Sequence, residues 1–125
     1  MSIAAKIKIE ERDRVLTNAV LRAAEKLQVN GKELSAILGV SGPTISRMKK
    51  EELFLEDGSK PFELGVLFVR FFRSLDAITG GDTKTANYWL RNENTALGGI
   101  PLDEIKSITG LTNGLAYLDS RRAPL

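Results

Sequence analysis

The apolar positions between residues 31 and 50 fall at the spacing of two short helices that cross at a tight turn. They are Leu34 and Leu38 in the first helix, Val40 in the bend, and Ile45 and Met48 in the second helix. Gly39 can end the first helix in a left-handed backbone conformation, and Ser41 can cap the second helix. The pattern therefore predicts a helix-turn-helix unit. The alternative is an ordinary helical hairpin inside a core.

The outward positions of the second helix are polar or basic. Those that we expect to face DNA are Ser41, Thr44, Ser46, Arg47, Lys49 and Lys50. Ser46, Arg47 and Lys50 are predicted to read base edges in a major groove, and the others to lie nearer the phosphate backbone. DNA binding is therefore the leading interpretation of this segment.

Residues 10–29 show a helical pattern on the N-terminal side of this unit. Its apolar positions recur every three or four residues and are Leu16, Val20, Ala23 and Leu27. Residues 1–9 have no such stripe and are expected to form a loose arm or a short edge strand. Within the connection at residues 53–61, the Asp57-Gly58 pair can form a hairpin turn, with residues 53–55 pairing briefly against the chain beyond the turn.

Residues 62–78 form a predicted helix that is apolar around most of its circumference and holds four of the five phenylalanines. Its main apolar face carries Leu64, Phe68, Phe71, Leu75 and Ile78. Val66 and Val69 lie towards the other side of this helix. A helix of this kind must be buried on more than one side. It is either a central core helix or, in part, the interface of a homodimer that binds two DNA half-sites.

The last third of the chain begins after Thr79-Gly80-Gly81, which separates residues 1–79 from residues 80–125. Asp82 or Thr83 can cap a helix that continues to residue 90, with a polar loop at residues 91–95.

Two further helices are predicted in this part. Pro101 suits the first turn of a helix that is expected to run to Ile108 and to stop at Gly110. A final helix is predicted from near Thr112, and residues 120–125 are expected to form a short basic tail. The fold class is therefore all-α, with a helix-turn-helix unit followed by a small, mainly helical domain.

Composition removes several classes of chemistry. The 125-residue chain has no cysteine and no histidine, which excludes disulfides, thiolate nucleophiles, most zinc sites and the usual general base near neutral pH. No acid and base stand at a catalytic spacing, so we expect no enzyme activity, no metal and no cofactor. The formal net charge of +2 is small, so one copy should bind DNA weakly.

The sequence shows no membrane or secretory segment. No N-terminal run is long enough for the apolar part of a signal peptide. The most apolar stretch, residues 62–78, carries Glu63, Arg70, Arg73 and Asp76, which argues against a membrane span. We therefore expect a soluble, cytoplasmic protein.

Residues 85–105, TANYWLRNENTALGGIPLDEI, combine several features in a fixed order. An alanine and a tryptophan-leucine pair share one helix, and an asparagine-rich loop, a leucine-glycine-glycine turn and a proline-leucine helix start come after it. The residues are Ala86, Trp89, Leu90, Asn92, Asn94, Leu97, Gly98, Gly99, Pro101 and Leu102. This order resembles the toxin-binding domain of the Xre/MbcA/ParS antitoxin family, whose Xre-like members also carry a helix-turn-helix. The family often has a basic residue after the glycine pair, where this chain has Ile100.

The resemblance implies an antitoxin of a type II toxin-antitoxin pair. It implies that the chain inhibits a RES-domain toxin that depletes cellular NAD, and that it represses its own operon as a DNA-binding protein. The residues that it assigns to toxin binding are Trp89, Asn92, Asn94, Leu97, Leu102, Arg121 and Arg122. The basic C-terminus is then a plausible plug for the toxin's active site, because guanidinium groups pair well with anion-binding sites.

Simpler roles stay open for the same residues. The spacing of Trp89 with Ala86 and Leu90 also suits a core anchor, and Gly98-Gly99 is typical of a backbone turn, since no phosphate-binding motif surrounds it. Arg121 and Arg122 could be solvated charges. The competing function is a stand-alone helix-turn-helix repressor whose C-terminal region serves oligomerisation or effector binding.

Overall fold

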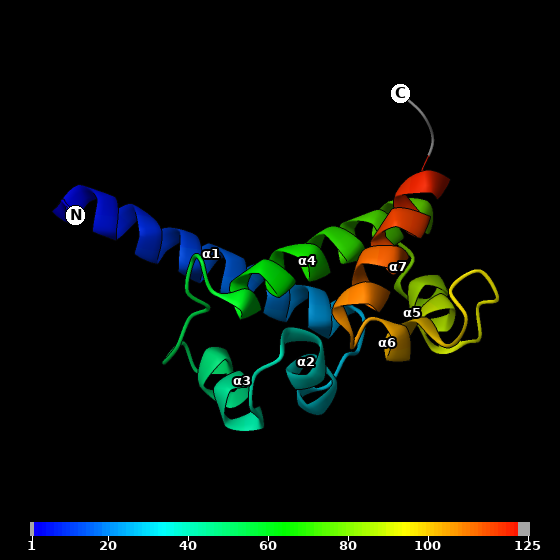
Figure 1. Ribbon diagram of the computed structural model, residues 1–125, viewed down its shortest axis with the longest axis horizontal. Coiled ribbons are helices and arrows are strands. Elements are labelled where there is room, and N and C mark those ends of the chain that lie inside the picture. The colour runs from blue at the N-terminus through cyan, green and yellow to red at the C-terminus, as the bar shows by residue number, and fades with distance from the viewer. Residues whose placement is uncertain (1, 123–125) are drawn as a thin grey trace.

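The computed structural model describes residues 2–122, which form seven helices and no strand (Figure 1). The helices are α1 (Ile3–Lys26), α2 (Gly31–Leu38), α3 (Gly42–Lys49), α4 (Lys60–Ile78), α5 (Thr83–Arg91), α6 (Pro101–Glu104) and α7 (Ile108–Arg121). The prediction of an all-α fold is confirmed. Between residues 2 and 122, no helix is long and apolar enough to cross a membrane.

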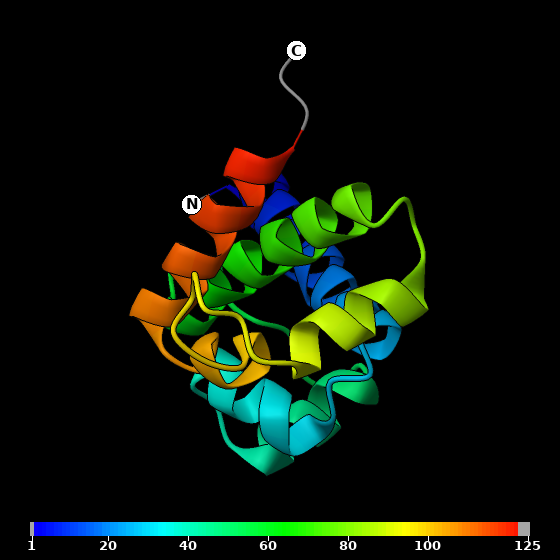
Figure 2. The ribbon, with the colours of Figure 1, turned by 90° about the vertical axis from the view of Figure 1, so that its right-hand side faces the viewer.

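Helix α4 is the central element of the fold. It packs against α1, α2 and α7, and it crosses the middle of the molecule in Figure 2. Phe68 and Phe71 are fully buried, and Val69, on a neighbouring face, is only 6 % exposed. One copy of the chain therefore already buries this helix on more than one side, as expected for the central core helix.

The N-terminal segment corrects one prediction, because residues 3–9 are the first turns of α1 and form neither a loose arm nor a strand. The Ser2 hydroxyl caps this helix by accepting a hydrogen bond from the Ala5 backbone amide at 3.1 Å. Ile3 and Ile7 stay 80 % and 56 % exposed, and this end of α1 projects beyond the other helices (Figure 1). A helical segment that buries little needs no apolar stripe, so its periodicity could not reveal it.

The connection between α3 and α4 is anchored to α1 by hydrogen bonds. The backbone amide of Leu55 donates to the Thr17 hydroxyl at 2.8 Å, and that hydroxyl donates to the Asp13 carbonyl at 2.7 Å. The backbone amide of Asp57 donates to the Asp13 carboxylate at 2.9 Å. These amides find their acceptors on α1 and not on a neighbouring strand. The predicted strand pairing of residues 53–55 is therefore wrong.

Gly110 lies inside a helix and does not end one, which corrects a second prediction. Helix α6 ends at Glu104, and the Ser107 hydroxyl caps α7 by accepting a hydrogen bond from the Gly110 backbone amide at 3.0 Å. A β-carbon at Gly110 would lie 1.7 Å from the Glu104 carbonyl oxygen. Glycine is thus required here because α7 and the end of α6 approach each other closely.

Helix α7 is also longer than predicted, since it begins at Ile108 and continues through Arg121. Ser120 and Arg121 are therefore helical and do not belong to a tail, whereas residues 123–125 of that prediction lie outside the described residues. Leu111 and Leu118 join the same apolar cluster as the buried residues of α1 and α4. The division into residues 1–79 and 80–125 stays a prediction, with a continuous core on both sides of it.

Replacing Gly110 by alanine should destabilise the protein, because the new methyl group cannot fit beside Glu104 unless α6 moves. We expect the free energy of unfolding to fall by about 2 to 3 kcal/mol, as for other overpacked sites. Gly42→Ala is the matched control, since the space around Gly42 is open and the change should stay within about 0.5 kcal/mol. Urea unfolding followed by circular dichroism checks both values. Equal midpoints for the two variants would contradict the close approach.

Candidate functional site

Helices α2 and α3 cross as the apolar spacing predicts. The residues that they bury against each other and the core are Leu34, Ile37, Leu38, Ile45 and Met48. Gly39 has a φ of 70°, the left-handed conformation that ends α2. In the turn, the Ser35 hydroxyl donates a hydrogen bond to the Val40 carbonyl. The buried positions of α3 thus fix which of its faces points outward.

The predicted DNA-binding residues on α3 fall into different environments. The Ser41 hydroxyl accepts a hydrogen bond from the Thr44 backbone amide at 3.2 Å, and the two hydroxyl oxygens are 2.9 Å apart. These two side chains therefore serve the cap of α3. Ser46, Arg47 and Lys50 are exposed, and within residues 2–122 their side chains form no hydrogen bond or ion pair. They are the members of the set that are available to a partner.

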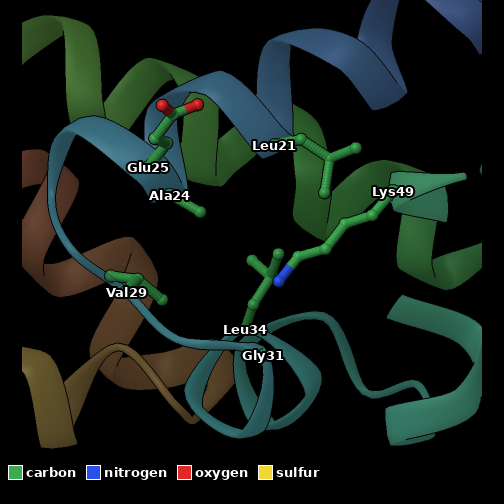
Figure 3. Close-up of a pocket in the computed structure, with 7 residues that line it drawn as sticks. All are labelled: Leu21, Ala24, Glu25, Val29, Gly31, Leu34 and Lys49. Carbon is green, nitrogen blue, oxygen red and sulfur yellow. The ribbon is translucent and has the colours of Figure 1, made fainter. Parts of the chain in front are cut away.

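Lys49 turns away from these three residues. Figure 3 shows its side chain reaching back from the end of α3, with the nitrogen beside Leu34 and Gly31. It lines a pocket that is bounded by α1, α2 and the segment between them. A contact between Lys49 and a DNA phosphate therefore requires this side chain to swing out of the pocket.

Asp82 caps the N-terminus of helix α5. Asp82 accepts hydrogen bonds from the Lys84 backbone amide and from the Thr85 hydroxyl, both at 3.0 Å. The hydroxyl of Thr85, and then the backbone amides of Thr85 and Lys84, lower the pKa of Asp82 because these bonds favour the ionised carboxylate. Of the two caps that the sequence allows, the structure uses Asp82.

Trp89 anchors α5 to the rest of the fold. Its ring centroid lies 6.1 Å from that of Phe71 in α4 and 6.4 Å from that of Tyr117 in α7. Trp89 is partly buried, whereas its neighbour Tyr88 is 72 % exposed. The simpler role of Trp89 as a core anchor fits this geometry. Tyr88, which no sequence pattern singled out, is the exposed aromatic side chain of this helix.

Asn94 shapes the loop between α5 and α6. Its side-chain oxygen accepts hydrogen bonds from the backbone amides of Ala96 and Leu97 at 3.0 and 3.3 Å. Its own backbone amide donates to the Gly99 carbonyl at 2.9 Å. Gly98-Gly99 therefore completes a tight turn, as predicted, and Leu97 is half-buried beside it.

Two other residues of the predicted toxin-binding set differ in exposure. Asn92 is exposed, and its side-chain amide donates to the Tyr88 carbonyl at 2.7 Å. Leu102 is only 6 % exposed and packs in the core. Its place in the toxin-binding set stays a prediction, and its burial shows that its side chain also supports the fold of α6.

The C-terminal arginines lie against neighbouring side chains. The guanidinium group of Arg121 lies 5.0 Å from the centroid of the Tyr117 ring. Arg122 donates to the Ser74 hydroxyl at 3.5 Å, and Ser74 donates to the Asp119 carboxylate at 2.6 Å. Both arginines are exposed. Such surface contacts contribute little free energy, so a partner could take these groups at small cost.

A polar link between the two halves of the chain was not foreseen from the sequence. Arg91 donates to the Gln28 carbonyl and to the Asn87 side-chain oxygen, both at 2.7 Å. Asn87 also donates to the Lys26 carbonyl at 3.2 Å. Side chains of α5 therefore satisfy one carbonyl group in the last residue of α1 and one just beyond it. Gln28 lies 63 positions before Arg91 in the sequence. No local pattern marks such a pairing.

The structure thus combines a helix-turn-helix with an appended, packed helical segment. Residues 9–70 match the antitoxin Xre-like helix-turn-helix domain, and residues 74–123 match the antitoxin Xre/MbcA/ParS C-terminal toxin-binding domain. The chain therefore belongs to the Xre-type antitoxins. A comparison with curated proteins found none that matches the chain.

Substitutions at Trp89 and at its exposed neighbour Tyr88 test whether Trp89 anchors α5 to the rest of the fold. Trp89→Ala should lower the free energy of unfolding by about 3 kcal/mol, the lower end for such changes, because the ring is only partly buried. Tyr88→Ala, at an exposed neighbour, should change it by less than about 0.5 kcal/mol. Thermal unfolding measures both. A similar loss of unfolding free energy in the two variants would contradict the role of Trp89 as an anchor.

Proposed function

We propose that this antitoxin neutralises a RES-type toxin that depletes NAD, as part of a type II toxin-antitoxin pair in the cytoplasm, and that it represses its own operon. The observation that carries the proposal is an Xre-like helix-turn-helix and a toxin-binding domain in one chain. We assign DNA binding and dimerisation to residues 1–79 and toxin binding to residues 80–125. Helix α3 and the C-terminal end of α7 lie on different sides of the molecule (Figure 1), so one copy can present both surfaces.

Replacing Arg47 and Lys50 together by alanine should abolish operator binding, because both side chains are exposed on α3 and free to reach base edges. Each lost base contact typically costs about 1 to 3 kcal/mol. Lys32→Ala, an exposed lysine on α2, is the control and should keep binding nearly unchanged. A gel-shift assay with the DNA upstream of the gene provides the readout. Intact binding by the double variant would show that the recognition helix is wrongly assigned.

A homodimer is the proposed DNA-binding form, since the net charge of +2 gives one copy few phosphate contacts. We place the dimer interface at an apolar groove of about 330 Å³ between α1 and α4. Its apolar lining residues are Val15, Leu16, Ala19, Phe62, Val66 and Val69. Val69 is already buried in one copy, whereas Val15 is 59 % exposed, so Val15 is the suitable position for a polar probe.

Val15→Glu should split the dimer and leave the subunit folded, because the new charge would be buried only in the interface. Ile108→Glu is the matched control, since Ile108 is a similarly exposed aliphatic residue on α7 and is 56 % exposed. Light scattering gives the mass of each variant, and circular dichroism its helical content. A folded Val15→Glu protein that is still dimeric would place the interface elsewhere.

The arginine pair at the end of α7 is proposed to contribute to toxin inhibition. Arg121→Ala plus Arg122→Ala should raise toxin activity in the complex and leave operator binding unchanged, because charge-assisted hydrogen bonds to the toxin would be lost. Lys84→Ala, an exposed cation at the start of α5, serves as the control. Growth and cellular NAD with co-expressed toxin are the readouts. Full neutralisation by the double variant would leave inhibition to the packed helices alone.

The alternative is a stand-alone repressor whose C-terminal helices serve oligomerisation or effector binding. One observation suits it, because α7 packs on α4 as part of the same core. Co-expression with the product of the neighbouring gene, followed by pull-down, separates the two functions. A captured RES-domain protein whose toxicity is suppressed supports the antitoxin. A neighbouring product that neither binds nor harms cells favours the repressor.

A further inference from the structure

A hollow of about 410 Å³ lies between the ends of α4 and α7. Its lining residues are Ala77 and Ile78 from the last turn of α4, and Arg121 and Arg122 from the end of α7. Both helices end on the upper side of the molecule in Figure 2. All four side chains are exposed, and no acidic residue is among the described residues that line the hollow. The hollow therefore combines an aliphatic surface with two guanidinium groups.

Ile78 is the largest apolar residue of this hollow. Phe68, Phe71 and Leu75 of the same helix are at most 1 % exposed, whereas Ile78 is 41 % exposed. A single exposed aliphatic residue is ordinary on a protein surface. Its position beside two arginines is more informative, because arginine is enriched in protein interfaces and apolar side chains form their buried centres.

The two arginines are held at the edge of the hollow by weak contacts. The Arg121 guanidinium lies 5.0 Å from the centroid of the Tyr117 ring, and Arg122 donates to the Ser74 hydroxyl at 3.5 Å. The Asp119 carboxylate accepts a hydrogen bond from that hydroxyl at 2.6 Å and does not line the hollow. Within residues 2–122, neither arginine forms an ion pair. Both can therefore pair with a carboxylate of a partner.

The domain matches favour the toxin as this partner. The match to the toxin-binding domain covers residues 74–123 and so includes all four lining residues, whereas the helix-turn-helix match ends at residue 70. The last turn of α4 thus belongs with α7 in the matched domain. Ile78 follows Val69 by nine positions, which is about 180° around a helix. The hollow and the proposed dimer groove therefore lie on different faces of α4.

We propose that the toxin places in this hollow a segment that carries a carboxylate beside an aliphatic side chain. The carboxylate would pair with Arg121 and Arg122, and the aliphatic side chain would cover Ala77 and Ile78. Ile78 is then the apolar anchor of the toxin interface, which extends from residues 80–125 back into the last turn of α4. This inference rests on the proposed neutralisation of a toxin by this chain.

Ile78→Ala tests the anchor in a binding assay with the purified product of the neighbouring gene. The Kd should rise at least about tenfold, as for a residue at the centre of an interface. Ile108→Ala is the matched control, because Ile108 is 56 % exposed at the other end of α7, and its Kd should stay within about twofold of the wild type. Isothermal titration calorimetry gives each Kd. An Ile78→Ala protein with the affinity of the wild type would overturn the proposal.

A double variant, Ile78→Ala plus Arg121→Ala, tests whether the two residues contact one toxin segment. Residues in one contact are energetically coupled, so the loss of affinity should differ at least about threefold from the product of the two single losses. Single losses that simply multiply would overturn the placement of both residues in one site.

Two further measurements separate the toxin interface from the fold and from the proposed function. The free Ile78→Ala protein should unfold at nearly the same urea concentration as the wild type. A loss of stability as large as that of Trp89→Ala would show that the chain itself covers Ile78, and would overturn the proposal. A wild-type protein that does not bind the neighbouring gene product would overturn the proposed neutralisation, and this inference with it. If the wild type and Ile78→Ala both bind and neutralise the toxin equally, only the role of the hollow is overturned.

Discussion

The burial of α4 is the constraint on which the other elements depend. Phe68 and Phe71 are completely enclosed, and α1, α2 and α7 each pack on this helix. Burying one large apolar side chain stabilises a fold by roughly 1.5 to 3 kcal/mol, which exceeds the contribution of an exposed ion pair. A β-carbon at Gly114 would lie 3.1 Å from the Phe71 ring, so α7 rests directly on this aromatic surface. The helix-turn-helix and the C-terminal segment therefore both pack on α4.

The polar contacts between the elements have a different role from the core. The bonds of Thr17 with Leu55, and of Arg91 with Gln28, each join segments far apart in the sequence. A single hydrogen bond contributes only about 1 kcal/mol net, but a buried amide without an acceptor is costly. Such bonds therefore select one arrangement among those that the apolar contacts allow. They fix the α3–α4 connection on α1, and α5 on the end of α1.

Helix α3 divides its charged residues between two environments. Ile45 and Met48 are buried, which turns Ser46, Arg47 and Lys50 outward. Lys49 is next to them in the sequence but extends towards α2. Since neighbouring positions on a helix are about 100° apart, a single buried ridge is enough to separate adjacent lysines in this way. The direction of each side chain decides which neighbours its charged group can reach.

The sequence alone determined the elements whose signals are local. The crossing of α2 and α3 followed from the spacing of Leu34, Leu38, Ile45 and Met48, and its turn followed from Gly39, because periodicity and left-handed glycine act over a few residues. The order of residues around Trp89 likewise indicated the antitoxin family, which the two domain matches show.

Only the tertiary structure decided features that depend on distant neighbours. The sequence suggests that Gly110 ends a helix, whereas the structure places it inside α7 beside the Glu104 carbonyl group. The burial of Leu102 likewise depends on the residues that pack around it in the core. The helical start of α1 gave no amphipathic signal because Ile3 and Ile7 remain exposed. In each case the contacts of the residue, or their absence, cannot be read from the few residues around it in the sequence. They are determined by how the helices pack around α4.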